Sequence, residues 1–123
     1  MSLCTAVTVH RNGGFFKKEI RMNLFDFVTP DSDGDEDVTA LLERDGIRIE
    51  RIVSSGQSSG WYDQREGEFV ALISGEAELE FDSGECIRMS AGDTIFIVPH
   101  KRHRVKSTSK EPPCVWLCVF FSE

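Results

Sequence analysis

The sequence predicts an all-β fold made of one domain, and three observations support this prediction. Between residues 47 and 121, short runs rich in β-branched and aromatic residues are separated by glycine and serine. The run at 76–81, EAELEF, alternates strictly between carboxylate and apolar side chains, as a strand with one wet and one dry face does. No helical pattern is long enough to be the crossover of a parallel sheet. We therefore expect a closed antiparallel sandwich or barrel.

The first 46 residues are expected to form an N-terminal arm. Short apolar runs at 6–9, 15–16 and 24–28 are separated by glycines and charged residues, which is typical of an arm with one or two strand pieces. A short helix is predicted near 38–44, where Asp35 or Asp37 would cap its start and Gly46 would follow its end.

The acidic segment 31–37 invites comparison with a calcium-binding EF-hand loop. Such a loop beginning at Asp31 needs glycine at position 36 and glutamate at position 42. The sequence has Glu36 and Leu42 there, so an acidic turn that opens the helix is the better interpretation.

The predicted barrel occupies residues 47–121. Its expected strands are 47–53, 61–64, 68–73, 76–81, 86–89, 94–98, 102–106 and 115–121. Asp82-Ser83-Gly84-Glu85 is typical of a tight hairpin turn, and a second hairpin is expected at Ser74-Gly75-Glu76. The terminal run Val119-Phe120-Phe121 fits two arrangements: an edge strand that pairs across a dimer, or a strand buried in its own barrel.

Charge and hydropathy disfavour two classes of function. The 21 acidic and 14 basic side chains give a net charge of −7, the opposite of what phosphate neutralisation by a nucleic-acid binder needs. The basic cluster at 100–104 is short, and we interpret it as the wall of a pocket. No apolar run reaches the roughly 18 residues of a membrane span, and residues 1–10 lack the features of a secretory signal. We expect a cytoplasmic protein without membrane contact.

Four cysteines stand at positions 4, 86, 114 and 118. Only Cys114 and Cys118 are close in sequence, and on a strand they share one face with Trp116 and Phe120. A redox or metal pair is one interpretation. Two buried thiols that pack as small apolar residues are the favoured one, because cytosolic thiols are normally reduced.

Two stretches of the sequence carry residues that are typical of a ligand-binding or metal site. The first contains Gly56, Tyr62, Gln64, Glu68 and Gly75, and the second contains Gly92, Pro99, His100 and His103. Tyr62 and Gln64 are two residues apart, so on a strand both side chains point to the same face.

These stretches resemble the two motifs of the cupin superfamily of small jelly-roll barrels, G-x5-H-x-H-x3-E-x6-G and G-x5-P-x-G-x2-H-x3-N. In the first motif both glycines and Glu68 match, and the two histidine positions hold Tyr62 and Gln64. In the second, Gly92 and His103 match, whereas the proline, glycine and asparagine positions hold Val98, His100 and Ser107.

The resemblance implies a cupin-type double-stranded β-helix whose interior holds a small ligand. In that family two histidines, one glutamate and a third histidine bind a divalent ion, usually iron, manganese, zinc or nickel. The corresponding ligands here would be Gln64, Glu68 and His103, a weaker set than one with three histidines. The alternative is a metal-free pocket in which these three side chains hydrogen-bond one another or a ligand.

For other residues near this pocket the sequence allows more than one role. Tyr62 and His100 are candidate proton donors or acceptors for catalysis. Trp61 and Tyr62 could stack on a ligand or pack against other side chains of the protein. Arg104, like Arg51 and Arg65, could bind an anion or form an ion pair with a carboxylate on the surface.

Two functions follow from this set of residues. The first is a metal-dependent enzyme, such as a dioxygenase, isomerase or decarboxylase, that acts on a small polar metabolite. The second is a non-catalytic, metal-free module that binds or senses a small ligand. A homodimer is expected in either case.

Overall fold

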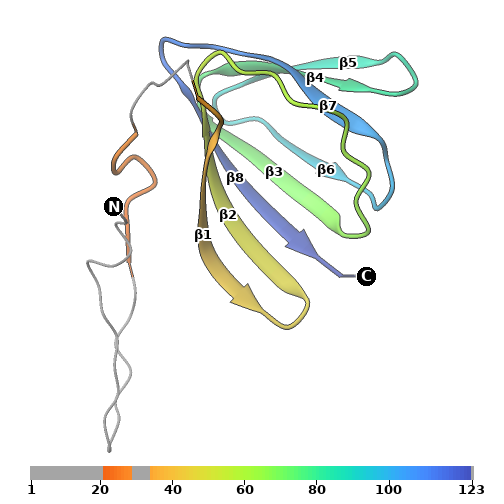
Figure 1. Cartoon of the computed structure of the whole chain (residues 1–123), viewed down its shortest axis with the longest axis horizontal. Coiled ribbons are helices and arrows are strands. Elements are labelled where there is room, and N and C mark those ends of the chain that lie inside the picture. The colour runs from red at the N-terminus through yellow and green to blue at the C-terminus, as the bar shows by residue number, and fades with distance from the viewer. Residues whose placement is uncertain (1–20, 29–33, 123) are drawn as a thin grey trace, which may run out of the picture.

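The computed structural model describes residues 21–28 and 34–122, and Figure 1 shows two antiparallel β-sheets that face each other. The larger sheet has the strand order β1-β2-β8-β3-β6, and the smaller has the order β5-β4-β7. The strands are β1 (Asp37–Arg44), β2 (Ile47–Ser54), β3 (Gly67–Ser74), β4 (Glu76–Phe81), β5 (Cys86–Ser90), β6 (Thr94–Ile97), β7 (His103–Thr108) and β8 (Cys114–Phe121). The predicted all-β jelly-roll architecture is confirmed.

Membrane-spanning helices are absent from the described part of the chain.

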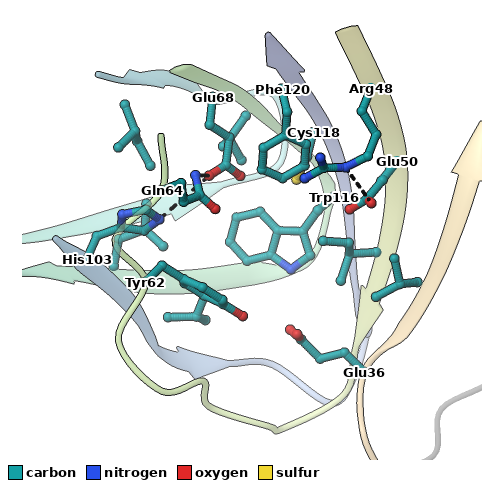
Figure 2. A pocket seen from close by; sticks show the side chains of 16 residues that line it. Glu36, Arg48, Glu50, Tyr62, Gln64, Glu68, His103, Trp116, Cys118 and Phe120 are labelled. Atoms are coloured by element: carbon teal, nitrogen blue, oxygen red, sulfur yellow. Dashed lines mark hydrogen bonds and ion pairs between the residues drawn. The ribbon is translucent and has the colours of Figure 1, made fainter. Parts of the chain in front are cut away.

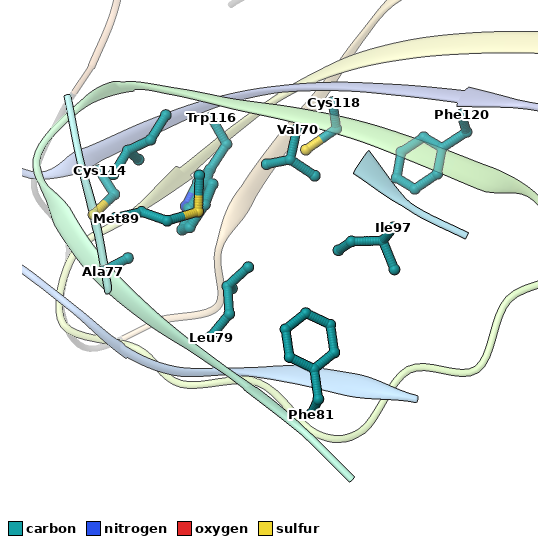
Figure 3. Close-up of a cluster of buried hydrophobic side chains, with 11 residues drawn as sticks. Val70, Ala77, Leu79, Phe81, Met89, Ile97, Cys114, Trp116, Cys118 and Phe120 are labelled. Atoms are coloured by element: carbon teal, nitrogen blue, oxygen red, sulfur yellow. The ribbon is translucent and has the colours of Figure 1, made fainter. Parts of the chain in front are cut away.

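The core lies between the two sheets, as Figure 3 shows. On β4 the predicted alternation is confirmed: Ala77, Leu79 and Phe81 are buried, whereas the glutamates between them point away from the core. On β8 every second side chain faces the same interior, namely Cys114, Trp116, Cys118 and Phe120. Each large side chain buried in this way contributes about 1.5–3 kcal/mol to folding. Both thiols pack here as small apolar residues.

Gly75 is the corner at which the chain passes from the larger sheet to the smaller one. β3 pairs with β6 and β8, whereas β4 pairs with β5 and β7, so the hairpin predicted at 74–76 does not form. Gly75 has φ +89°, and a Cβ atom there would lie 2.8 Å from Cα of Cys114 and 2.9 Å from the carbonyl oxygen of Pro113. The close approach of β8 to the corner therefore requires glycine.

The helix predicted near 38–44 is wrong, because this segment forms β1. Its residues pair with β2 in antiparallel register, from Asp37 opposite Val53 to Arg44 opposite Ile47. Asp45 and Gly46 form the two-residue turn between these strands, and Gly46 has φ +80°. Asp-Gly is a strong hairpin signal, and strand pairing has overridden the weak local helix preference.

The pairing corrects one further strand prediction and decides between two arrangements that the sequence left open. Residues 61–64 form no strand, since only Tyr62 makes an isolated bridge, to His103. β8 lies between β2 and β3, in the interior of the larger sheet, so the run 119–121 is not an edge strand.

Arg51 fixes the described part of the N-terminal segment to the outer face of the larger sheet. It is 1% exposed, and its Nη1 donates hydrogen bonds to the carbonyl oxygens of Leu24 and Asp26. Residues 24–27 form a turn rather than a strand piece, and Figure 1 shows this segment beside β1. The strand pieces predicted at 6–9 and 15–16 lie outside the described residues.

Candidate functional site

The loop between β2 and β3 brings Tyr62 and Gln64 to the interior of the barrel. The backbone N–H of Tyr62 donates to the carbonyl oxygen of His103 at 2.7 Å, and the N–H of His103 donates back at 3.1 Å. Two residues later, the N–H of His100 donates to the carbonyl oxygen of Gln64 at 2.7 Å. These bonds hold an irregular segment antiparallel to β7, so both side chains face inward although no regular strand forms.

Glu68 and His103 form the polar centre of the site. They are 7% and 4% exposed, and they come from β3 and β7, one strand from each sheet. Nε2 of His103 lies 3.6 Å from Oε1 of Glu68, and Nε2 of Gln64 donates a hydrogen bond of 3.0 Å to the same oxygen. Two nitrogen groups therefore converge on one buried carboxylate oxygen (Figure 2).

The backbone orients the His103 ring. Its Nδ1 lies 2.8 Å from the carbonyl oxygen of Lys101, and a carbonyl only accepts, so Nδ1 carries a hydrogen and Nε2 is directed to Glu68. Burial of the ring lowers its pKa, but the carboxylate of Glu68 and the carbonyl of Lys101 favour the charged form more strongly. The net result is a pKa of His103 raised above its ordinary value.

The polar centre opens into a cavity of about 230 Å³ between the sheets. Its apolar wall consists of Val38, Ile52, Val70, Leu79, Ile97, Val105, Trp116, Cys118 and Phe120. Its polar wall consists of Glu36, Arg48, Glu50, Tyr62, Gln64, Glu68 and His103. A cavity with apolar walls and a few converging polar groups is typical of small-molecule sites.

A second polar group lies across the cavity from Glu68. Nε1 of Trp116 donates to Oγ of Ser54 at 3.1 Å, and that hydroxyl donates to Oε2 of Glu36 at 2.7 Å. This relay fixes the indole ring and places a carboxylate beside Tyr62 (Figure 2). Burial, followed by the charge of Glu36, raises the pKa of the Tyr62 phenol, so Tyr62 is a neutral hydrogen-bonding group at neutral pH.

The structure brings together four of the seven residues predicted for the site: Tyr62, Gln64, Glu68 and His103. The other three, Trp61, His100 and Arg104, are not among the residues that line the cavity. Nη2 of Arg104 lies 2.6 Å from Oε1 of Glu80, and the Arg104 guanidinium lies 5.1 Å from the centre of the Trp61 ring. Arg104 thus pairs on the surface, which was one of the two arrangements left open by the sequence.

His100 lies at the rim, on the loop between β6 and β7. Its Nδ1 is 2.8 Å from Oδ1 of Asp63, and both side chains are exposed. His100 also has φ +63°, a conformation that glycine adopts more easily, and it occupies the position where the second motif has glycine. Its contacts connect the two loops beside the cavity.

Sequence reasoning missed Glu36, Arg48 and Glu50 as cavity residues. Arg48 and Glu50 alternate on β2 with outward-facing residues, and this alternation was a usable signal because Ile52 continues it. The sequence alone predicts an acidic turn at Glu36. Nothing local in the sequence distinguishes it, since its position depends on β1 and on the contact with Ser54.

The donor set fits a divalent metal poorly. Oε1 of Glu68 is already approached by the nitrogens of Gln64 and His103, and the Tyr62 phenol stays protonated. The residues described here contain no cluster of three or more His, Cys, Asp or Glu side chains that could hold a metal ion. Three hydrogen-bonded groups, rather than three free ligands, occupy the positions that the resemblance assigned to a metal.

Comparison with known families agrees with the fold. The family model for the cupin domain matches residues 49–120, more than half of the chain. The chain belongs to the cupin family. A search among curated proteins found no match.

Several solved structures resemble this one. A candidate mannose-6-phosphate isomerase from Ralstonia eutropha JMP134 has 38% sequence identity and a TM-score of 0.80, over 85% of this chain and 100% of that chain. A cupin superfamily protein from Desulfitobacterium hafniense DCB-2 has 16% identity and a TM-score of 0.72, over 95% and 100%. An RmlC-like cupin from Desulfovibrio desulfuricans has 17% identity and a TM-score of 0.68, over 84% and 97%. The last two show the fold alone.

Proposed function

We propose that this cupin binds a compact small molecule in the cavity between its sheets and that it does so without a metal ion. The observation that carries the proposal is the cluster of Gln64, Glu68 and His103 at one end of an otherwise apolar cavity. The cluster offers hydrogen bonds that orient a ligand, and the side chains of Trp116, Ile52 and Leu79 supply apolar contact. The cavity of about 230 Å³ is below the range of drug-sized sites, so the ligand is small.

The activity in the name of the Ralstonia protein does not transfer readily to this pocket. A sugar phosphate is an anion, and anion recognition normally uses free arginine or lysine groups. Among the residues that the structure describes, Arg48 is the arginine that lines the cavity, and it is bonded to Glu50 and Glu66, each at 2.9 Å. The lining therefore supports a binding module better than a sugar-phosphate enzyme.

Metal analysis of untagged purified protein tests the proposal. We expect iron, manganese, zinc and nickel to be far below one ion per chain. We also expect the melting temperature to stay unchanged when a chelator is added. One ion per chain in the wild type, lost in Glu68→Ala and His103→Ala but kept in the surface variant Glu85→Ala, would overturn the metal-free mode and favour the metal-dependent enzyme.

Ligand binding itself is read from Trp116. Trp61→Phe removes the exposed tryptophan and leaves Trp116 as the fluorophore in the cavity wall. A screen of small metabolites should find one that shifts this fluorescence and raises the melting temperature, as a ligand specific for the folded state must. Glu68→Gln should weaken that binding about tenfold, because a charge-assisted hydrogen bond becomes a neutral one.

A further inference from the structure

Glu36 is a carboxylate at the cavity without a positive partner among the described residues. It immediately precedes β1, and its Oε2 accepts the hydroxyl hydrogen bond of Ser54 at 2.7 Å. The ion pairs of residues 21–28 and 34–122 involve other carboxylates: Asp37, Glu50, Asp63, Glu66, Glu68 and Glu80. A hydroxyl donor satisfies one lone pair of Glu36 but leaves its charge uncompensated.

The lining of the cavity is negative as far as the described residues form it. These include three carboxylates, Glu36, Glu50 and Glu68, and two basic groups, Arg48 and His103. When His103 is protonated, the two basic groups neutralise two of the three carboxylates, and a net charge of −1 remains. Arg48 is also shared with Glu66, which lies outside the cavity lining, so it has less charge to offer a ligand. Low dielectric in a half-enclosed cavity strengthens the effect of this excess on any bound ion.

Aromatic faces lie beside the uncompensated carboxylate. Figure 2 shows the Glu36 carboxylate directed into the cavity below the rings of Tyr62 and Trp116. The faces of aromatic rings attract cations, and tryptophan does so most strongly. The Phe120 ring is already covered by the guanidinium of Arg48, 4.1 Å from its centre, so Tyr62 and Trp116 are the rings left for a ligand.

We propose that the ligand is a compact organic cation, an amine whose ammonium group lies against Glu36 and the rings of Tyr62 and Trp116. Its apolar body packs on the wall that Ile52 and Leu79 help to form, and its other end faces the cluster of Glu68 and His103. This inference rests on the proposed function and adds the ligand class. Anions are disfavoured by the same charges.

Three probes of similar size and different charge test the ligand class: benzylamine, benzyl alcohol and benzoate. Their affinities are measured by calorimetry and by Trp116 fluorescence in the Trp61→Phe protein. We expect benzylamine to bind about tenfold more tightly than benzyl alcohol, and benzoate to bind most weakly.

A matched pair of variants assigns the preference to one carboxylate. Glu36→Gln keeps an oxygen that can accept from Ser54, so the relay to Trp116 is retained while the charge is removed. It should lower the affinity for benzylamine about tenfold and leave that for benzyl alcohol within about twofold. Glu85→Gln, in the exposed turn between β4 and β5, removes one charge away from the cavity and should change neither affinity.

The outcomes separate this inference from the proposed function. If benzyl alcohol binds the cavity as tightly as benzylamine, the cation preference is overturned while ligand binding stands. The same holds if Glu36→Gln and Glu85→Gln have equal effects on benzylamine. If none of the three probes binds at millimolar concentration, both the ligand class and the small-molecule pocket are overturned.

Discussion

Glu68 and His103 show how one residue pair sets the chemistry of this cavity. Burial alone would keep the imidazole neutral, and Glu68 reverses that preference. Because the pKa of His103 is higher in the folded than in the unfolded protein, the pair contributes stability that is fully present below the unfolded pKa. That contribution is lost as the pH rises through the folded pKa.

The His103 pair gives a prediction that NMR can check. The ring protons of His103 should titrate with a pKa above 6.5 in the wild type. In Glu68→Gln, burial becomes the dominant influence, so the pKa of His103 should fall below that of the wild type. Glu85→Gln, in the exposed turn between β4 and β5, is the control and should leave the pKa of His103 as it is in the wild type. An unchanged His103 pKa in Glu68→Gln would mean that Glu68 does not stabilise the charged ring.

The cysteines give a second prediction at the residue scale. Cys86 is exposed, whereas Cys114 and Cys118 are buried, and burial followed by the charge of Glu68 raises the pKa of Cys118 well above its ordinary value. Thiolates, not thiols, react with alkylating agents. Iodoacetamide at neutral pH should therefore modify Cys86 in the native protein and spare Cys114 and Cys118, as read by peptide mass spectrometry. Denaturant should make Cys86, Cys114 and Cys118 equally reactive.

At the scale of elements, the corners between sheets place the site. Gly75 takes the chain from β3 to β4, so Glu68 on one sheet comes to face His103 on the other. β7 then carries His103 beside the loop that holds Tyr62 and Gln64. The geometry of the polar centre therefore depends more on where the chain passes from one sheet to the other than on any single strand.

Substitution at the Gly75 corner tests this dependence. Gly75→Ala adds a Cβ atom against the backbone of Cys114 and Pro113, and it also strains a residue at φ +89°. We expect a loss of about 3 kcal/mol in the free energy of unfolding. Gly84→Ala is the control, because Gly84 has φ +94° but no atom within 4 Å of the added carbon. It should cost about 1–2 kcal/mol from backbone strain alone. Equal losses in urea unfolding would rule out the clash.

At the scale of the molecule, the outer face of the larger sheet is apolar. Phe69 on β3 is 39% exposed and Phe96 on β6 is 46% exposed, and the ring of Phe96 stacks on Phe121 with centres 5.7 Å apart. Residues 23–28 reach this face near Arg51 on β2, two strands away from β3 in the sheet order. A flat apolar face can pair with its own copy about a two-fold axis, and contiguous apolar surface of this kind marks interaction sites.

We predict that a second copy of the chain covers this face, giving the homodimer expected from the sequence. Sedimentation equilibrium should give twice the chain mass of 13.9 kDa. Phe96→Glu should shift the equilibrium toward monomer by at least about tenfold, because a charge would enter an apolar contact. Trp61→Glu changes an exposed aromatic residue outside this sheet and should leave the dimer intact. A wild-type protein of single-chain mass would contradict the prediction.

Local sequence patterns predicted much of the fold because apolar and polar residues alternate along most strands, and this alternation indicates which face is buried. The run 76–81 forms β4 with the expected buried face, and the turn at 82–85 joins β4 to β5. The segment 38–44 was mistaken for a helix because its pairing with β2 is a nonlocal interaction, and local propensity is a weak guide against it.

The sequence by itself determined the strand pattern, the family motifs and the candidate set of Tyr62, Gln64, Glu68 and His103, because spacing and residue type are local properties. Only the tertiary structure decided that Gln64 and His103 approach the same oxygen of Glu68, and that Glu36 enters the same cavity. Those contacts join residues far apart in the chain, and their geometry depends on how the sheets cross. The tertiary structure also places Trp61, His100 and Arg104 outside the cavity lining, because the side chains that contact them come from other strands and loops.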